Sequence, residues 1–265
     1  MNTLHRMPVL FVGHGSPMNA IEDNPWRRRW QQLGAELPRP RAVLCVSAHW
    51  ATRGVAVTAS PRPETIHDFY GFPPELFAVR YPAPGDPGLA ATIARQVGDA
   101  AVPVQLDPQR GLDHGTWSVL CAMYPAADVP VLQLSLDVRQ PGAWHYALAQ
   151  RLAFLREAGV LVVASGNIVH NLQLLGRYWN APQPPDWAAR FRDRVRDAVL
   201  QHDHAALCAW PTLGADVALA VPTPEHYLPL LYALALQRPD EPAELFNDDV
   251  FATLAMTSVC VGARA

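Results

Sequence analysis

Four short apolar runs constrain the fold of this chain more than any other feature of its sequence. They are Pro8–Val12, Ala42–Ser47, Val129–Leu136 and Val160–Ser165. Nearly unbroken apolar runs are typical of strands that are covered on both faces of a sheet. Helical patterning lies between and after them, at Trp26–Leu37, Pro87–Asp99, Ser118–Tyr124, Ala143–Glu157, Trp187–Gln201 and Glu225–Ala235. The sequence therefore predicts an α/β sandwich in which helices cover both faces of a central parallel or mixed sheet.

The 265 residues are enough for one large domain or two small ones. No internal repeat, low-complexity tract or change in composition marks a boundary, so we predict a single domain over residues 1–265. Many of the 26 prolines stand in the predicted connections, where their fixed φ stiffens a loop. The structure of the segment Ala51–Pro87 is the least predictable.

The basic side chains are all arginine, because the Lys+Arg total of 21 contains no lysine. This excludes Schiff-base and pyridoxal-phosphate chemistry, a P-loop lysine and a lysine general base. With ten histidines in the chain, we expect histidine to carry most acid, base or metal chemistry. The four cysteines are dispersed and form no C-x-x-C pair, so we expect reduced thiols rather than disulfides or a thiolate metal site.

A net charge of −3 gives no general attraction to nucleic acid or to an anionic membrane, so we expect a small-molecule partner. No apolar stretch approaches the ~20 residues of a membrane span, and the first residues lack the pattern of a signal peptide. The sequence therefore predicts a soluble, cytoplasmic protein. Charged residues make up 17%, below the roughly 25% of average globular proteins, which leaves a homo-oligomer as one option.

Three histidines follow three of the predicted strands. His14 stands after the first run, His49 after the second, and His170 after the run that ends at Ser165. Ligands of open α/β sheets bind beyond the carboxyl ends of the strands. We therefore expect these three side chains to converge at one edge of the sheet.

A fourth histidine, His226, lies in the segment PTPEHY. Thr223 is a natural N-cap there and Pro224 a natural first residue, which places His226 in the first turn of a predicted helix. The positive end of the helix dipole keeps the ring neutral for metal binding. A cluster of imidazoles without a metal would leave nitrogens unsatisfied, so we predict a shared site that suits Fe(II), Mn or Zn.

The other histidines have different predicted roles. His114 precedes a predicted helix and either faces the substrate or caps that helix. His67 lies in an aromatic loop and either packs there or covers a ring-shaped substrate. Four more are expected to be solvated or structural, namely His5, His145, His202 and His204. The chain has no serine nucleophile elbow, no dinucleotide-binding G-x-G-x-x-G and no H-E-x-x-H motif.

Six segments, taken in order, resemble one enzyme family. They are GHGSPMNAIEDN, VSAHW, TIHDFYGFP, LDHGTWSVL, ASGNIVHNL and PTPEHYLPLLYAL. The chain resembles, nearly end to end, the DODA-type extradiol aromatic ring-opening dioxygenases, a class III family that includes bacterial and plant DOPA extradiol dioxygenases. The resemblance implies that His14, His49 and His226 bind metal. It also implies that His114 and His170 line the substrate side of a single catalytic domain.

The chain departs from the family at the late ligand, where Glu225 and His226 are adjacent. Better-studied members resemble a two-His-one-carboxylate site. Neighbours on a helix point about 100° apart, so we do not expect both to bind one ion. His226 is the predicted ligand, and Glu225 supports it or replaces it. His170 acts in acid–base catalysis or is a further ligand, particularly of zinc, which favours four-coordination.

The implied reaction inserts both atoms of O₂ into the ring of a small aromatic diol such as DOPA and gives a ring-opened semialdehyde. It needs one Fe(II) per chain, since Zn(II), which suits the same ligands, has no accessible redox change. His170 would move a proton and His114 would hydrogen-bond the substrate. A zinc-dependent hydrolase with His170 or Glu225 as base, or a non-catalytic metal-binding module, remains an alternative. For a substrate carboxylate, the arginines considered are Arg53, Arg80 and Arg177.

Overall fold

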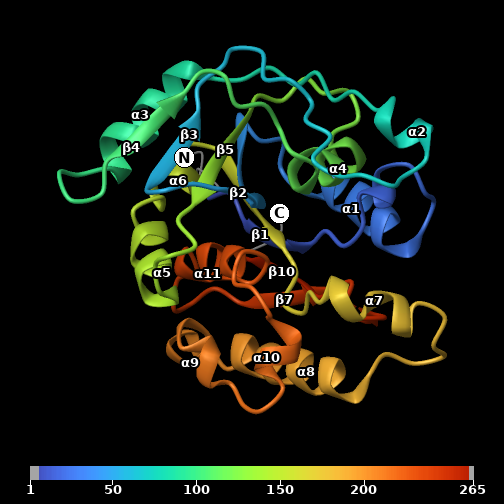
Figure 1. The fold of residues 1–265 in the computed structure, drawn as a ribbon. Coiled ribbons are helices and arrows are strands. Elements are labelled where there is room, and N and C mark those ends of the chain that lie inside the picture. The colour runs from blue at the N-terminus through green and yellow to red at the C-terminus, as the bar shows by residue number, and fades with distance from the viewer. Residues whose placement is uncertain (1–5, 263–265) are drawn as a thin grey trace.

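The computed structural model describes residues 6–262, and its strands form one large sheet and a small ribbon (Figure 1). The large sheet has eight strands in the order β4-β3-β5-β2-β6-β1-β10-β7. They are β1 (Val9–Gly13), β2 (Ala42–Ala51), β3 (Val55–Thr58), β4 (Val104–Asp107), β5 (Val131–Leu136), β6 (Val160–Gly166), β7 (Ala243–Phe246) and β10 (Ser258–Val261). The ribbon pairs β8 (Val250–Phe251) with β9 (Leu254–Ala255).

The four predicted strands are the four at the centre of the sheet. β5, β2, β6 and β1 are parallel neighbours, so their carboxyl ends share one edge. Both faces of β1, β5 and β6 are buried, which is why these segments show no polar alternation. β2 differs from the prediction because it continues to Ala51 through a register shift against β5. His49 therefore lies inside the strand rather than after it.

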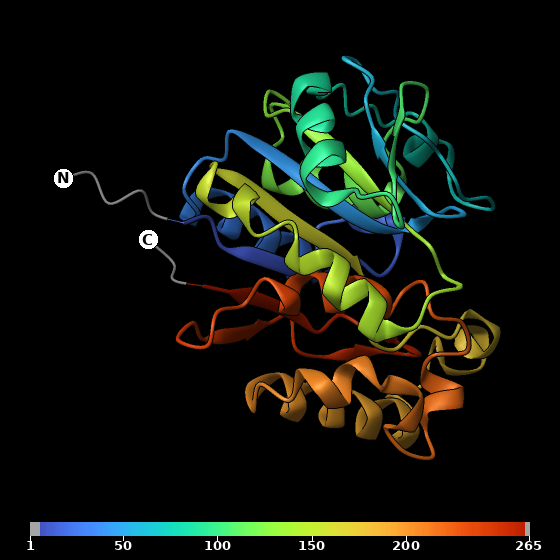
Figure 2. The same cartoon turned by 90° about the vertical axis from the view of Figure 1, so that its left-hand side faces the viewer.

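Helices cover both faces of the sheet, as predicted (Figures 1 and 2). One face carries η1 (Pro17–Ala20), α1 (Pro25–Glu36) and α4 (His114–Met123). The other carries α3 (Pro87–Val97), α5 (Gly142–Gln150), α8 (Asp186–Leu200) and α11 (Leu228–Ala235). The remaining helices are short: α2 (Pro74–Phe77), α6 (Phe154–Glu157), α7 (Leu172–Tyr178), α9 (His204–Cys208), η2 (Trp210–Thr212) and α10 (Val217–Ala220).

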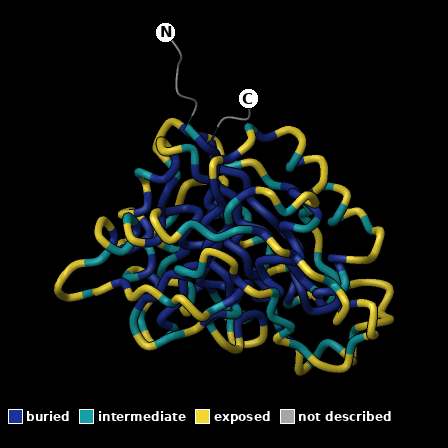
Figure 3. The backbone as a smooth tube through the Cα atoms, turned by 90° about the horizontal axis from the view of Figure 1, so that it is seen from above, coloured by how far each residue is buried: buried dark blue, intermediate teal, exposed yellow. Residues whose placement is uncertain are grey.

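The burial of the backbone agrees with this layered arrangement. The central strands are buried, and the exposed residues gather in the peripheral connections (Figure 3). The predicted α/β class is confirmed, and antiparallel pairing of β3 with β5 and of β10 with β1 makes the sheet mixed. The assignment of residues 1–265 to a single domain stays a prediction. No helix within residues 6–262 is long and apolar enough to cross a membrane.

The sequence patterns missed the outer strands of the sheet. β3, β4, β7 and β10 have only four residues each, too few to display a period. The predicted helix Ala143–Glu157 is in fact two helices, α5 and α6, with a turn over residues 151–153 between them.

α4 begins at His114 rather than at Ser118, so the histidine opens the helix instead of preceding it. The cause is Asp113, whose side chain accepts hydrogen bonds from the backbone N–H and the hydroxyl of Thr116 and so caps the helix. His114 is thereby fixed at the sheet edge by the geometry of a helix terminus.

α11 begins at Leu228 rather than at Glu225, so the prediction that His226 lies in its first turn is wrong. Pro229 has no N–H and cannot make the helical hydrogen bond to the carbonyl of Glu225. The Thr223 hydroxyl donates to the Glu225 carboxylate and does not cap the helix. His226 therefore lies in a turn before α11, and the helix-dipole argument does not apply to it.

A buried ion pair ties three separated segments together near the start of β1, away from the carboxyl ends of the central strands. The guanidinium of Arg156 donates to both oxygens of Glu241 at 2.7 Å and to the carbonyls of Met7 and Leu236. Burial raises the pKa of Glu241, but hydrogen bonds from Arg156 and from the backbone of Arg238 outweigh it and lower the pKa to about 2. Glu241 therefore stays ionised in the folded protein down to strongly acidic pH.

We expect Glu241→Gln to lower the free energy of unfolding by about 3 kcal/mol at pH 7, because it leaves a buried guanidinium without its counter-charge. Since folding depresses this pKa, the contribution is complete above the ordinary value of 4.5 and disappears as the pH falls toward about 2. Urea unfolding at several pH values measures both effects. Glu157→Gln, at a carboxylate that is 61% exposed, is the control and should change stability little. Equal stability of the Glu241 variant and the native protein at pH 7 would contradict this account.

Candidate active site

The structure brings five histidines together at the carboxyl edge of the central strands. They are His14 after β1, His49 in β2, His114 at the start of α4, His170 after β6 and His226 before α11. The ring centroid of His14 lies 5.0 Å from that of His49, 5.4 Å from that of His226 and 5.7 Å from that of His114. One cluster is thus assembled from five segments of the chain.

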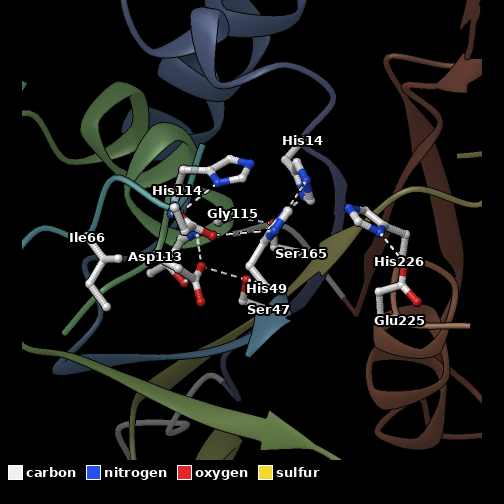
Figure 4. Close-up of polar contacts among 12 residues, drawn as sticks. His14, Ser47, His49, Ile66, Asp113, His114, Gly115, Ser165, Glu225 and His226 are labelled. Carbon is white, nitrogen blue, oxygen red and sulfur yellow. Dashed lines mark hydrogen bonds and ion pairs between the residues drawn. The ribbon is translucent and has the colours of Figure 1, made fainter. Parts of the chain in front are cut away.

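Three of the five rings turn a nitrogen toward a common point. The Nε2 atoms of His14 and His49 are 3.1 Å apart. Nε2 of His226 is buried and has no hydrogen-bond partner among the described residues. A ligand atom from each of the three rings lies within 4.8 Å of the others, and Figure 4 shows the rings facing one another. A buried nitrogen without a partner is costly unless something else meets it, and a metal ion would do so.

The tautomer of His14 follows from its second nitrogen. The hydroxyl of Ser165 donates its proton to the carbonyl of Gly115 at 2.5 Å. The same oxygen lies 3.0 Å from Nδ1 of His14 and can only accept there. His14 is therefore protonated on Nδ1 and presents the lone pair of Nε2 to the common point.

Carboxylates stand behind the other two rings. Oδ2 of Asp68 lies 3.5 Å from Nδ1 of His49, and Oε1 of Glu225 lies 3.3 Å from Nδ1 of His226. An oxygen partner on the outer nitrogen is the usual support of a metal-binding histidine, because it orients the ring and fixes the tautomer. Glu225 adjoins the outer side of the His226 ring in Figure 4, and whether it supports this ring or binds the metal itself stays a prediction.

The site favours neutral imidazoles. Burial lowers the pKa of His14 and of His226 well below the ordinary value, and the other histidines of the cluster lower both further. Burial and His114 lower the pKa of His49 to about 4, although nearby carboxylates oppose them. Neutral rings are the form that binds a metal ion, so at neutral pH these three nitrogens need lose no proton to do so.

His114 lies beside this trio rather than within it. Its ring centroid is 3.9 Å from that of His49, and its edge packs on the ring of Phe69. Oδ1 of Asp68 accepts from both the backbone N–H and Nδ1 of His114, at 3.0 and 2.9 Å. Burial raises the pKa of Asp68, but the hydrogen bonds and charges of His114 and the charge of His49 lower it to about 2.

His170 stacks face to face on His226, with ring centroids 3.5 Å apart and planes inclined by 5°. Its backbone N–H donates to the carbonyl of Ala220, and an isolated bridge to Leu254 holds the segment. Burial and His49 lower the pKa of His170 to about 4. His170 is more exposed than His14 and His226, so its ring lies at the periphery of the cluster and not at its centre.

Two glycines allow the segments to approach this closely. A Cβ at Gly166, the last residue of β6, would lie 2.2 Å from the carbonyl oxygen of His226. A Cβ at Gly115 would lie 2.6 Å from Oγ of Ser47 and 2.9 Å from the His49 ring. Because these two glycines have no Cβ, the end of β6 can approach the turn that carries His226, and the start of α4 can approach β2.

A buried polar network supports the backbone of His49. The carboxylate of Asp113 accepts from the hydroxyl of Ser47 and from the side-chain amide of Gln133, both at 2.6 Å. Arg110 donates to this carboxylate and to the carbonyl of His49. These contacts hold the end of β2 that follows its register shift against β5.

The histidines outside the cluster have structural partners. His67 packs among aromatic rings and approaches the carbonyl of Val79, whereas His145 is buried between a tyrosine hydroxyl and a backbone carbonyl. His204 contacts Tyr146 and Gln237, and His202 is exposed. His5 lies outside the described residues. Of the three arginines considered for a substrate carboxylate, Arg80 donates to two carbonyls of its own loop.

Sequence reasoning missed Asp68, Ser165 and Asp113 as parts of the site. Asp68 is the neighbour of a histidine that was singled out, and Asp113 precedes His114, but a lone carboxylate carries no periodic signal. In the sequence, Ser165 is only the last residue of an apolar run. Their roles depend on contacts between segments that are distant in the sequence.

Comparison with known proteins gives a consistent result. The family described as the catalytic LigB subunit of aromatic ring-opening dioxygenase matches residues 8–261. The chain is 46% identical to a 4,5-DOPA dioxygenase extradiol of Escherichia coli (strain K12), over 97% of this chain and 95% of that protein. It is 36% identical to a protein of the same name from Beta vulgaris, over 91% and 90%. A crystal structure of an uncharacterized protein from Escherichia coli K12 superposes with a TM-score of 0.84 at 42% identity, over 97% of this chain and 100% of that one.

We expect Gly115→Ala to weaken zinc binding by about tenfold or more, because the new methyl group pushes on Ser47 and on the His49 ring. Overpacking should also lower the free energy of unfolding by about 1–3 kcal/mol. Competition with a fluorescent chelator measures the first effect, and urea unfolding measures the second. Gly176→Ala is the matched control, since its Cβ would meet nothing within 4 Å. Native zinc affinity in the Gly115 variant would show that this contact does not position His49.

Proposed function

Since the chain belongs to the family of the catalytic LigB subunit of aromatic ring-opening dioxygenases and is an extradiol ring-cleaving enzyme, we propose a specific substrate for it. This substrate is a catechol of the DOPA type. The support for this substrate is that relatives which match over about nine-tenths or more of both chains are 4,5-DOPA dioxygenase extradiol enzymes by name. The catechol would be cleaved beside its hydroxyls and would give a ring-opened semialdehyde.

The family uses a non-haem metal, and we propose His14, His49 and His226 as its ligands. The observation that carries this assignment is the buried Nε2 of His226, which has no partner among the described residues and lies near the Nε2 atoms of the other two rings. Three neutral imidazoles, each with an oxygen behind Nδ1, form a donor set suited to a divalent transition metal.

We propose Fe(II) as the active metal, at one ion per chain. When bound, it would supply a Lewis-acidic centre with open positions and an accessible redox change, the second of which zinc lacks. Zn(II) suits the same three nitrogens and would give a loaded but inactive protein. Glu225 keeps a supporting place in this proposal, because its Oε1 stands behind Nδ1 of His226.

The remaining two histidines would act on the substrate. His170 borders the ligand trio and is partly exposed, so one of its ring nitrogens can take a proton from a catechol hydroxyl and later return it. His114 lies on the other side of His49 and would hydrogen-bond the substrate. Phe69, which packs on the His114 ring, would help to exclude water.

The alternatives of a zinc hydrolase and of a non-catalytic metal module lose their support. Relatives named as extradiol dioxygenases match at 36% and 46% identity, and similarity of this extent shows more than a shared fold. We keep as proposals the cytoplasmic location, the homo-oligomer and the lack of a nucleic-acid or membrane partner, because only composition and a net charge of −3 support them.

The decisive experiment loads the metal-free protein with Fe(II) under anaerobic conditions and then adds O₂ and a panel of catechols that includes DOPA. We expect the Fe(II)-loaded protein to consume oxygen and to form a coloured semialdehyde. The zinc-loaded protein should do neither. A panel that gives no oxygen uptake at all, while zinc-loaded protein hydrolyses esters, would refute the proposed function.

Alanine substitutions distinguish the proposed metal ligands His14 and His49 from the proposed substrate-facing residue His114. His14→Ala and His49→Ala should abolish metal retention after gel filtration, because each removes one of three donors. His114→Ala should retain the metal and lower turnover by about 10²-fold, since it removes a contact to the substrate only. Metal analysis and oxygen-uptake rates provide the two readouts. Loss of metal from all three variants would contradict this division.

A further inference from the structure

We propose that Asp68 is a positioning residue whose carboxylate fixes the Nδ1–H tautomer of His114, so that Nε2 of His114 meets the substrate as a hydrogen-bond acceptor. The proposal rests on the proposed function, because it assumes that His49 binds metal and that His114 faces the substrate. It gives Asp68, already described beside His49, a second role at His114.

The contacts of Asp68 are divided between its two oxygens. Oδ1 accepts from the backbone N–H of His114 at 3.0 Å and lies 2.9 Å from Nδ1 of the same residue. Oδ2 lies 3.5 Å from Nδ1 of His49. The two rings adjoin, with centroids 3.9 Å apart, so one oxygen of Asp68 is hydrogen-bonded to His114 while the other faces His49.

A carboxylate suits this place because both of its oxygens only accept hydrogen bonds. The His114 ring must then carry a proton on Nδ1, and in a neutral ring this leaves the lone pair of Nε2 facing away from Asp68. An amide of the same shape has one accepting oxygen and one donating nitrogen, so only its oxygen could replace Oδ1 at the two N–H groups of His114. The accepting capacity of Oδ1 therefore sets the His114 tautomer.

The loop that carries Asp68 is attached to the segment that opens α4. The backbone N–H of Ile66 donates to the carbonyl of Leu112, and the indole of Trp117 donates to the carbonyl of Ile66, both at 2.8 Å. Asp68 and His114 therefore keep their relative position as parts of one packed unit. Their side chains are only 23% and 7% exposed, which limits competition from water.

The consequence for the reaction concerns the substrate's hydroxyl groups. An Nε2 that carries a lone pair and no proton binds an O–H group and does not donate to a carbonyl or an anion. His114 would thus hold a catechol through a hydroxyl that still carries its proton, while His170 stands on the far side of the ligand trio. By fixing the tautomer of His114, Asp68 would ensure that the proton of this hydrogen bond starts on the catechol oxygen and not on Nε2 of His114.

The same residues suggest one competing role, because His49, Asp68 and His114 could themselves hold a metal ion. Against this, Oδ1 of Asp68 already faces two N–H groups of His114. A ligand role would require His114 to give up its Nδ1 proton or to turn away. Metal content of Asp68 variants therefore separates the two roles.

The first test reads the tautomer directly. Zinc-loaded protein labelled with ¹⁵N in histidine gives long-range ¹H–¹⁵N correlations that distinguish protonated from unprotonated ring nitrogens, and His114→Gln identifies the His114 signals by their loss. We expect Nδ1 of His114 to be protonated and Nε2 to be bare. A protonated Nε2 would overturn the proposal. This readout does not depend on ring cleavage, so it remains informative if the proposed function is wrong.

The second test is Asp68→Ala, with Asp128→Ala as a control at an exposed carboxylate paired with Arg39. We expect Asp68→Ala to retain one zinc per chain and a cooperative melting transition, to alter the His114 tautomer signals, and to lower kcat about 10- to 100-fold with little change in KM. In a His114→Ala background the same substitution should change kcat by less than about twofold. Loss of zinc, or an equal loss of kcat in both backgrounds, would show that Asp68 acts through the metal or through His49 and would overturn the proposal.

Discussion

The site depends on one constraint, which is that several imidazoles share a space from which water is largely excluded. Burial and mutual repulsion both disfavour protonation, and so they lower the pKa values of His14, His49 and His226. The protein satisfies the outer nitrogens with a hydroxyl and two carboxylates and leaves the inner ones facing one another. Without an ion these inner lone pairs repel, so the arrangement favours the divalent metal proposed for it.

The order of the chain made the centre of this fold predictable. The four apolar runs are the four parallel strands, and because parallel strands end at one edge, the position of His14 and His170 could be inferred from the runs alone. The outer strands could not be inferred, because four residues show no period. The helix start at Leu228 depended on Pro229, whose missing N–H carried more weight than the favourable cap at Thr223.

The candidate site was predictable in its histidines and not in its supporting oxygens. Histidines at strand ends stand out because few structural needs place them there. Asp68, Ser165 and Asp113 contact residues that are far away in the sequence, so only the fold reveals them. Glu225 illustrates the same limit: its supporting place follows from the turn before α11, whereas the spacing argument assumed a helix that does not reach it.

The topology also dictates when the site can exist. Its residues extend from His14 to His226, and β1, which positions the first of them, lies between β6 and the last strand, β10. A nascent chain on the ribosome would present its first histidine early, yet that strand lacks both neighbours until most of the protein has been synthesised. With the proposed ligands His14, His49 and His226, the metal site is complete only after His226 has been synthesised and β1 has paired, so an incomplete chain offers no defined centre to an ion.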